Sequence, residues 1–179
     1  MRISGGYLKG RTFTPPADKW PTRPTTDIAR EGLFNTLTNF INYEEVIALD
    51  LFGGSGAHSF ELISRNCPKV HYVDLHRPCH EFVIKTANQL GIRQNLELYR
   101  MDYKAFILST NLQFGYIFAG PPYPLKEIPE LPDLILSKNL LHTEAVFVLE
   151  HHPQHSFEKH PNLWKTKHYG QTIFSFFKG

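Results

Sequence analysis

The chain has 179 residues, of which 41% are hydrophobic and 20% charged, so it can form one compact soluble domain and is too short for two. Its longest apolar runs fall far short of the roughly 20 residues of a membrane helix, and MRISGGYLKG at the N-terminus lacks the apolar centre of a signal peptide. We therefore expect a cytoplasmic protein that does not enter a membrane.

The N-terminal segment, residues 1–26, is the basic end of a chain whose net charge is only +2. The basic side chains of the first thirty residues are Arg2, Lys9, Arg11, Lys19, Arg23 and Arg30. An extended basic arm, interrupted by glycine and proline, can lie along a phosphate backbone, where each neutralised phosphate releases counterions. The alternative is a solvated tail with ordinary surface charge.

Hydrophobic periodicity predicts helices and strands that alternate along the chain. The predicted helices are 28–41, 57–66, 79–91, 103–110 and 126–141. The predicted strands are 46–52, 69–75, 96–101, 114–119 and 145–151, followed by a hairpin of 163–170 with 172–179. This order favours an α/β fold over residues 1–179, with a mostly parallel seven-stranded sheet, helices on both faces and a closing antiparallel hairpin.

The first predicted helix has a clear start and an apolar face. Thr25, Thr26 and Asp27 precede it as candidate caps. Its predicted apolar face consists of Ile28, Leu33, Phe34, Leu37 and Ile41.

Parallel sheets bind ligands beyond the carboxyl ends of their strands, and acidic residues stand at three such ends. The first strand ends in LDLFGGSGA, where Asp50 precedes glycines 53, 54 and 56, which let a ligand approach the backbone closely. Asp74 ends the second strand and could accept hydrogen bonds from a ribose, and Asp102 ends the third. The alternatives are packing glycines and a helix cap at Asp102. The pattern predicts an adenosine-type ligand and leaves a dinucleotide and S-adenosylmethionine open.

The fourth strand ends at the corner FAGPPYPL, residues 118–125. Two adjacent prolines can neither continue a helix nor lie in a central strand, so they expose Tyr123 on a stiff loop. A dinucleotide-binding dehydrogenase would give this corner no role.

Together, LDLFGGSGA, Asp74 and the proline-proline-aromatic corner resemble a class I S-adenosylmethionine-dependent methyltransferase acting on an exocyclic amine. The stretches RISGGYLKGRTF, RPTTDIAREGLFNTL, VLEH and KHYGQTIFSFF narrow the resemblance, over nearly the whole chain, to the RsmD family. That family methylates N2 of a guanine in the 16S rRNA of the bacterial small ribosomal subunit. The resemblance implies a Rossmann-like fold, S-adenosylmethionine as cofactor and 16S rRNA as partner. We expect a monomer.

The resemblance also implies roles for individual residues. Asp50 and the glycine turn would hold the amino-acid end of the cofactor, Asp74 its ribose, and Asp102 the adenine amine. The complete set of implied cofactor residues is Arg23, Thr25, Thr26, Asp50, Phe52, Gly53, Gly54, Gly56, Asp74, Leu75, Met101, Asp102 and Tyr103. The implied RNA-facing residues are Arg2, Lys9, Arg11 and Arg23, and the implied catalytic corner is Gly120, Pro121, Pro122 and Tyr123. Tyr123 would stack on a base that has left its helix.

The chain departs from the family at the corner, where Gly120 replaces the usual Asp or Asn. That side chain accepts a hydrogen bond from the target amine, so its loss predicts a rate deficit on the order of 10²–10³-fold. Another acceptor could take its place, the chain could bind cofactor and RNA without turnover, or the glycine could be an introduced substitution. Milder departures are His58, Ser59 and His76.

Methyl transfer from S-adenosylmethionine is a direct displacement that requires no metal and no nucleophilic side chain. We predict no metal site, since the histidines of 150–160 lie between prolines in a predicted loop and Cys67 and Cys79 have no metal-type spacing. Glu150 or His151, at the end of the fifth parallel strand, could border the site, but both are interpreted as structural. Two rival functions are a non-catalytic ribosome-assembly factor and a DNA adenine methyltransferase, whose usual target-recognition insert has no room in this chain.

Overall fold

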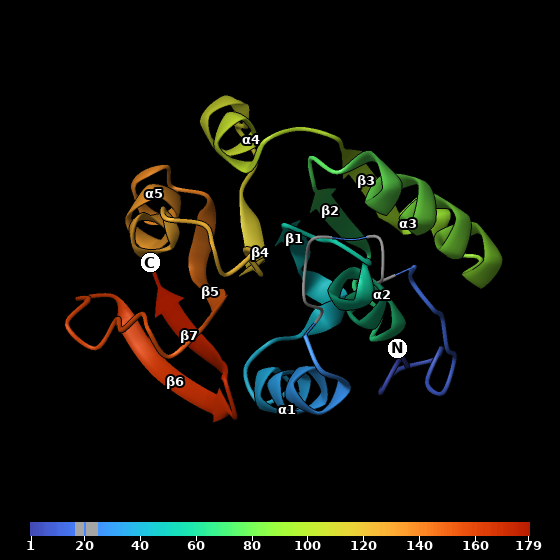
Figure 1. Ribbon diagram of the computed structural model, residues 1–179, viewed down its shortest axis with the longest axis horizontal. Helices are drawn as coiled ribbons and strands as arrows, with labels where there is room; N and C mark the ends of the chain where they lie inside the picture. The colour runs from blue at the N-terminus through green and yellow to red at the C-terminus, as the bar shows by residue number, and fades with distance from the viewer. Residues whose placement is uncertain (17–19, 21–24) are drawn as a thin grey trace.

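The computed structural model describes residues 1–16, 20 and 25–179, and it has one seven-stranded sheet in the order β3-β2-β1-β4-β5-β7-β6 (Figure 1). Strands β3, β2, β1, β4 and β5 are parallel neighbours, and β7 pairs antiparallel with both β5 and β6. The predicted fold class is confirmed: this is the Rossmann-like architecture of class I methyltransferases.

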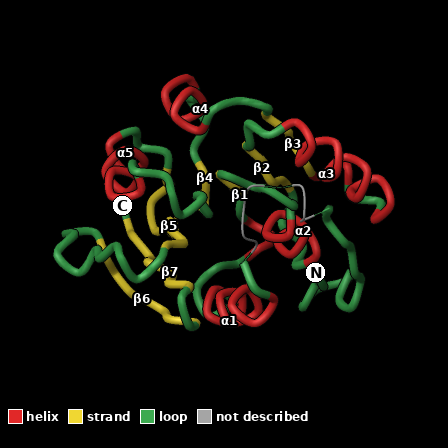
Figure 2. The backbone as a smooth tube through the Cα atoms, in the orientation of Figure 1, coloured by secondary structure: helices red, strands yellow, loops and turns green. Residues whose placement is uncertain are grey.

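The strands and helices alternate as predicted (Figure 2). The strands are β1 Ile47–Leu51, β2 Lys69–Val73, β3 Leu96–Tyr99, β4 Phe114–Ala119, β5 Leu141–His151, β6 Leu163–Tyr169 and β7 Thr172–Lys178. The α-helices are α1 Asp27–Leu37, α2 Ala57–Ser64, α3 Arg77–Leu90, α4 Tyr103–Ser109 and α5 Leu131–Ser137. Short 3-10 turns are η2 Tyr43–Glu45, η3 Arg93–Asn95 and η4 Ile128–Glu130. Among the described residues, no helix is long and apolar enough to cross a membrane.

The sheet separates two hydrophobic cores. Phe34 of α1, Phe60 of α2 and Val83 of α3 pack on one face, whereas Ile107 of α4 and Ile135 of α5 pack on the other. Side chains alternate between the faces of a strand, so every second residue of β1 and β4 faces α1, α2 and α3. The helices therefore cover both faces, and they leave the carboxyl ends of the strands free for a site.

Two helix predictions extend too far. The first helix ends at Leu37 rather than at 41, and Ile28, which was predicted to face the core, is 78% exposed. Arg30 takes a place on the buried face instead, at 3% exposed. The predicted helix 126–141 is wrong over its ends, because η4 and α5 cover only Ile128–Ser137 and β5 already begins at Leu141. Asn139, in the left-handed conformation with φ of 53°, turns the chain out of the helix.

The N-terminal arm forms a small hairpin on α2. Arg2 and Thr12 make an antiparallel bridge, and the main chain of Ile3 both donates to Arg11 and accepts from Gly10 at 2.9 Å. Ser4 attaches the hairpin to the buried Glu61 of α2, donating from its backbone nitrogen at 2.8 Å and from its hydroxyl at 2.7 Å. The basic arm is thus a docked hairpin over the residues that the structure describes.

Candidate functional site

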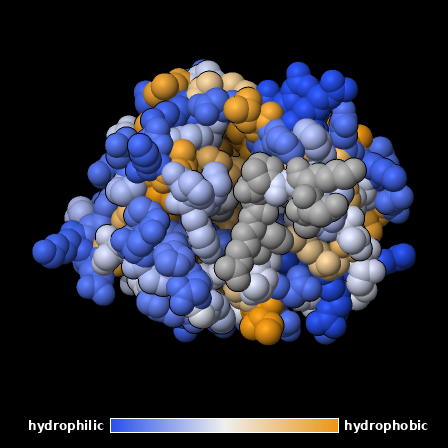
Figure 3. Space-filling model, in the orientation of Figure 1, coloured by the Kyte–Doolittle hydropathy of each residue, from blue (hydrophilic) through white to orange (hydrophobic). Residues whose placement is uncertain are grey.

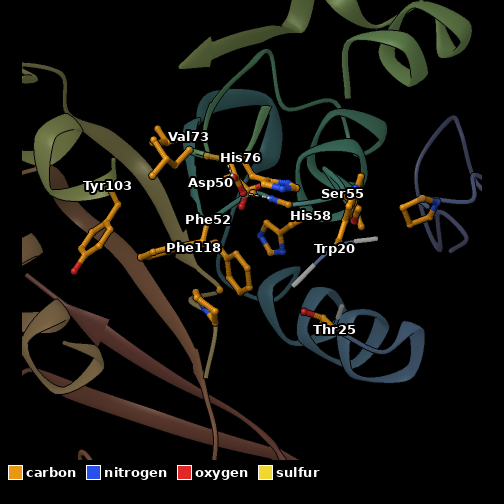
Figure 4. A pocket seen from close by; sticks show the side chains of 18 of the residues that line it. Trp20, Thr25, Asp50, Phe52, Ser55, His58, Val73, His76, Tyr103 and Phe118 are labelled. Carbon is orange, nitrogen blue, oxygen red and sulfur yellow. Dashed lines mark hydrogen bonds between the residues drawn. The ribbon is translucent and has the colours of Figure 1, made fainter. Parts of the chain in front are cut away.

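A cavity of about 620 Å³ lies at the carboxyl ends of β1, β2 and β4. In Figure 3, hydrophobic side chains surround a hollow near the centre of the view, and Figure 4 shows several of the lining side chains. The predicted site residues that line it are Thr25, Asp50, Phe52, Gly53, Gly54, Asp74, Leu75, Met101, Asp102, Tyr103, Gly120 and Pro122. The sheet therefore brings residues from five separate predicted motifs to one place.

Four of the described residues that were predicted to bind the cofactor or form the catalytic corner lie outside the lining. Thr26 caps α1, where its hydroxyl accepts a hydrogen bond from the backbone of Ala29 at 3.2 Å. Gly56 begins α2 and packs against α3, because a Cβ there would lie 2.9 Å from Val83. Pro121 is buried, and the ring of Tyr123 lies beside that of His152, with the ring centroids 5.5 Å apart and the planes tilted by 56°. Arg23 lies outside the described residues.

The glycine turn after β1 is packed tightly against β2. A Cβ at Gly53 would lie 2.2 Å from the ring of Tyr72, so this position accepts no side chain. Gly54 has φ of 50° and donates its backbone N–H to Oδ2 of Asp74 at 2.8 Å. The hydroxyl of Tyr72 donates to the carbonyl of Gly54 at 2.7 Å. These contacts hold the turn and Asp74 together at the cavity wall.

Asp50 is buried at the cavity floor with one carboxylate oxygen satisfied and one open. The hydroxyl of Ser59 donates to Oδ2 at 2.6 Å, whereas Oδ1 is buried and has no partner among the described residues. Burial, with a smaller contribution from the charge of Asp74, raises the pKa of Asp50 to about 7, although the hydrogen bonds from Ser59 act in the opposite direction. Ser59, a departure from the family pattern, thus orients this carboxyl group.

Within the described part of the chain, four buried polar side-chain atoms lack a partner, and all belong to residues that line the cavity. They are Nε1 of Trp20, Nη1 of Arg30, Oδ1 of Asp50 and the hydroxyl of Tyr103. Buried polar groups are nearly always hydrogen-bonded, so such a concentration indicates a place for a polar ligand. Arg30 also donates from Nη2 to Asp27 and to the carbonyl of Arg2, both at 2.7 Å, which fixes its guanidinium group.

Asp74 and Asp102 meet the cavity at the ends of β2 and β3. Asp74 accepts the backbone N–H of Gly54 on Oδ2 and that of His76 on Oδ1, and each oxygen keeps a further lone pair. Asp102 caps α4 by accepting from Lys104 at 2.8 Å and Ala105 at 3.2 Å, which confirms the alternative reading as a helix cap. Since it also lines the cavity, capping and ligand binding are compatible there.

A family model described as "Conserved hypothetical protein 95" matches residues 1–178. The chain belongs to this family, the RsmD family. It is 30% identical to the putative rRNA methyltransferase YlbH of Bacillus subtilis, over 84% of this chain and 82% of that one. It is 29% identical to ribosomal RNA small subunit methyltransferase D of Escherichia coli K12, over 92% of this chain and 81% of that one.

Solved structures agree with this family assignment. The putative methyltransferase yhhF of E. coli superposes with a TM-score of 0.84 at 27% identity, covering 99% of this chain and 97% of that one. A Thermus thermophilus hypothetical protein superposes at 0.87 with 21% identity, covering 100% and 99%, which shows the same fold.

At the corner where this RsmD-family chain has Gly120, neighbouring groups occupy the space around the missing side chain. A Cβ at residue 120 would lie 3.1 Å from Cε1 of Phe118 and 3.9 Å from Oε2 of Glu150. Glu150 is only 5% exposed and accepts a hydrogen bond from the hydroxyl of Thr25 at 2.5 Å. Burial raises the pKa of Glu150 to about 7, against that hydrogen bond.

His58 forms part of the wall beside this corner. Its ring stacks on Phe118 with centroids 3.8 Å apart (Figure 4), and its Nε2 hydrogen-bonds with the hydroxyl of Tyr116 at 3.1 Å. Burial, aided by the charge of Arg30, lowers the pKa of His58 well below its usual value. His58 is therefore neutral near pH 7 and serves as a flat packing surface. His151 hydrogen-bonds with Ser175 at 2.8 Å, in keeping with a structural role.

Sequence reasoning missed Arg30 and the proximity of Glu150 to Gly120. Arg30 could have been noticed, because it precedes Leu33 and Phe34 by three and four positions, which places it on the same helix face as these apolar residues. The approach of Glu150 depends on strand order, which the sequence does not specify. Arg2, Lys9 and Arg11 are exposed on the hairpin, as an RNA-facing surface requires.

Proposed function

We propose that the chain is an S-adenosylmethionine-dependent methyltransferase that modifies the exocyclic N2 amine of a guanine in the 16S rRNA of the small ribosomal subunit. The observation that carries the proposal is the pair of open, buried, oppositely charged atoms, Nη1 of Arg30 and Oδ1 of Asp50, in one cavity. An α-amino acid carries an ammonium and a carboxylate side by side, so this pair matches the methionine end of the cofactor.

The remaining lining residues fit the adenosine end. Asp74 has free lone pairs for the ribose hydroxyls, and Asp102 has one carboxylate oxygen outside its capping bonds for the adenine amine. Phe52 and Tyr103, with ring centroids 4.6 Å apart, and the neighbouring Met101 offer apolar surfaces to a purine. A cavity of about 620 Å³ is in the usual range for a ligand of this size.

When bound, the cofactor supplies a methyl group on a sulfonium that an amine can take by direct displacement. The protein then has to hold the amine close to that group, exclude water and accept the proton that nitrogen loses. Carboxyl groups, backbone carbonyls and the stiff Pro121-Pro122 corner are suited to this work, and no side-chain nucleophile is needed.

The proposed RNA substrate approaches past the corner and the hairpin. Tyr123 is half-buried beside His152, so it can present a ring to an unstacked base, and base-aromatic stacking is worth ~1–3 kcal/mol. Arg2, Lys9 and Arg11, together with Arg23, would contact phosphates. Relatives in E. coli and B. subtilis are named as rRNA methyltransferases, which supports an rRNA substrate. We infer that the 179 residues act as one domain, as a monomer and in the cytoplasm, where ribosomes are assembled.

A second candidate function is a ribosome-assembly factor that binds the cofactor and RNA without turnover. Gly120 favours it, because this position contributes no side-chain acceptor for the target amine. Both candidates predict that the protein binds the cofactor and RNA, but only the methyltransferase is predicted to transfer a methyl group to the RNA.

The test is transfer of a labelled methyl group to small ribosomal subunits that lack the modification. S-adenosylhomocysteine binding is measured by calorimetry on the same protein. We expect both binding and label in the RNA. Binding without label would support the assembly factor, and absence of binding would contradict both candidates.

A further inference from the structure

Glu150 stands beside Gly120 because β4 and β5 are parallel neighbours in register. Phe118 pairs with Val148 and Ala119 with Leu149, so residues 120 and 150 occupy the next position at the carboxyl ends of the two strands. Phe118 and Val148 belong to the same core cluster. Side chains at 120 and 150 therefore leave the sheet on that same face.

The carboxylate of Glu150 lies within van der Waals contact of the position that a Cβ at residue 120 would take. Its Oε2 is 3.9 Å from the position of a Cβ at Gly120, and the hydroxyl of Thr25 donates to it at 2.5 Å. Thr25 and Gly120 both line the cavity, so this carboxylate lies immediately behind the cavity wall. A side chain at 120 would also crowd Phe118, at 3.1 Å from Cε1, whereas glycine leaves that space open.

Burying this carboxyl group is unfavourable unless partners compensate for lost water. Glu150 is 5% exposed, and Thr25 is its hydrogen-bond donor among the described residues. A carboxylate can accept about four hydrogen bonds, so the group has capacity for a ligand's N–H. Ionisable groups that are buried beside a cavity in this way are often found at functional sites.

We propose that Glu150 supplies the hydrogen-bond acceptor for the substrate's exocyclic amine, in place of the side chain that Gly120 lacks. This inference rests on the proposed function, since it assigns a residue to the amine of that reaction. Glu150 would be a catalytic residue that contacts the amine, and Thr25 a positioning residue that holds Oε2 through its hydroxyl.

The proton balance is simple. The amine nitrogen forms a bond to the methyl carbon as the carbon–sulfur bond breaks with its electron pair on sulfur, and the nitrogen releases one proton. The carboxylate of Glu150 accepts that proton and later releases it to water. The raised pKa of Glu150, about 7, suits a group that must take up and release a proton near neutral pH.

The first test needs neither turnover nor ribosomal RNA. Protein loaded with S-adenosylhomocysteine is titrated with guanosine monophosphate and with inosine monophosphate, which lacks the N2 amine. We expect the wild type to prefer the guanosine nucleotide by about tenfold, as for a hydrogen bond to a charged group. Glu150→Ala should remove the preference, and Gly120→Asp in the Glu150→Ala background should restore it.

The second test measures methyl transfer by the same proteins. Glu150→Ala should lower kcat on the order of 10²–10³-fold with unchanged S-adenosylhomocysteine affinity, and Gly120→Asp should recover at least part of the loss. Glu150→Gln has nearly the same shape as the wild type, so it separates loss of the carboxylate from misfolding. Glu144→Gln changes an exposed residue of the same strand and is the matched control.

The inference would be overturned if the wild type bound the two nucleotides equally. It would also be overturned if Glu150→Ala kept both the preference for the guanosine nucleotide and the kcat of the wild type. A wild type that prefers the guanosine nucleotide through Glu150 but labels no ribosomal RNA would support the inference and contradict the proposed substrate.

Discussion

Asp50 and Glu150 are the two carboxyl groups at this site whose pKa burial raises to about 7, and each has a hydroxyl donor, Ser59 or Thr25. An isolated ionised carboxylate in a protein interior is strongly unfavourable, so such groups stay protonated to higher pH unless a cation binds. With pKa values close to neutral pH, both groups can lose their proton when a cationic or hydrogen-bonding ligand binds beside them. The open Oδ1 of Asp50 and the open Nη1 of Arg30 are thus the features of the cavity that most directly indicate its ligand.

Asp50 and Glu150 both make stability depend on pH, and a substitution at Asp50 isolates its share. Between about pH 4 and 7 the folded protein keeps a proton that the unfolded chain releases near the ordinary pKa of 3.8, so the free energy of unfolding falls as pH rises. Asp50→Asn should remove this contribution, on the order of 4 kcal/mol over that range. The measurement is urea unfolding of the wild type and of Asp50→Asn at several pH values. If the free energy of unfolding changed with pH in the same way in both proteins, the raised pKa of Asp50 would be contradicted.

The same substitution should weaken cofactor binding, because Asn has no charge for an ammonium group. We expect S-adenosylhomocysteine affinity to fall by about 10- to 100-fold at pH 7.5, as for a charge-assisted hydrogen bond. Calorimetry gives the affinity directly. Asp133→Asn, at an 85% exposed side chain on α5, is the matched control and should bind like the wild type. An unchanged affinity in Asp50→Asn would exclude Asp50 as the ammonium partner.

At the scale of elements, the sequence predicts what depends on local periodicity. The order of helices and strands, the glycine turn after β1 and the acidic strand ends all follow from residue spacing, and the fold class follows from their alternation. The limits of the helix 126–141 do not, because Pro129, Pro132 and Asn139 divide that region into a 3-10 turn, a short helix and the start of β5. Nor do the hydrogen bonds that Arg30 donates to Asp27 and to the carbonyl of Arg2, which make the burial of its guanidinium group possible.

The attachment of the hairpin to α2 is an element-level feature that sequence periodicity cannot reveal. Glu61 is fully buried, accepts two hydrogen bonds from Ser4 and pairs with Arg65 at 2.9 Å. Leu8 donates its backbone N–H to the hydroxyl of Ser64 at 3.0 Å, so the hairpin and α2 share polar as well as apolar contacts. Glu61 is thus the main polar anchor of the arm.

Glu61→Ala should therefore destabilise the protein on the order of 3 kcal/mol, because it leaves partly buried donors on Ser4 and Arg65 unpaired. Hydrogen exchange in residues 1–13 should rise more than in β1. Glu81→Ala is the matched control, since it breaks an exposed i, i+4 pair with Arg77 and should cost less than about 0.5 kcal/mol. Equal effects of the two substitutions would contradict the anchoring role.

At the scale of the whole molecule, the N-terminal hairpin lies beside α2 (Figure 1), and residues at its two ends reach the cavity. Met1 and Pro15, which flank the hairpin, are themselves part of the cavity lining. An RNA strand held by the exposed Lys9 and Arg11 would therefore pass close to the cavity. A net charge of only +2 means that this local concentration, rather than overall charge, has to supply the attraction.

Replacing Lys9 and Arg11 together by alanine should weaken RNA binding and reduce its salt dependence. Loss of two phosphate contacts lowers the slope of log K against log salt by about 1.5. The measurement is fluorescence anisotropy of a labelled 16S rRNA fragment at several salt concentrations. Lys138→Ala with Lys159→Ala, at exposed lysines after α5 and in the β5–β6 loop, should leave the slope nearly unchanged. Equal slopes for both double variants would place the RNA elsewhere.

The most direct test of the central claim is the chemical identity of the methylated product. Small ribosomal subunits treated with the protein and S-adenosylmethionine are digested to nucleosides and examined by mass spectrometry. The account predicts N2-methylguanosine with the wild type and its near absence with Asp50→Asn. A methylated adenosine, or label in ribosomal protein instead of RNA, would contradict it.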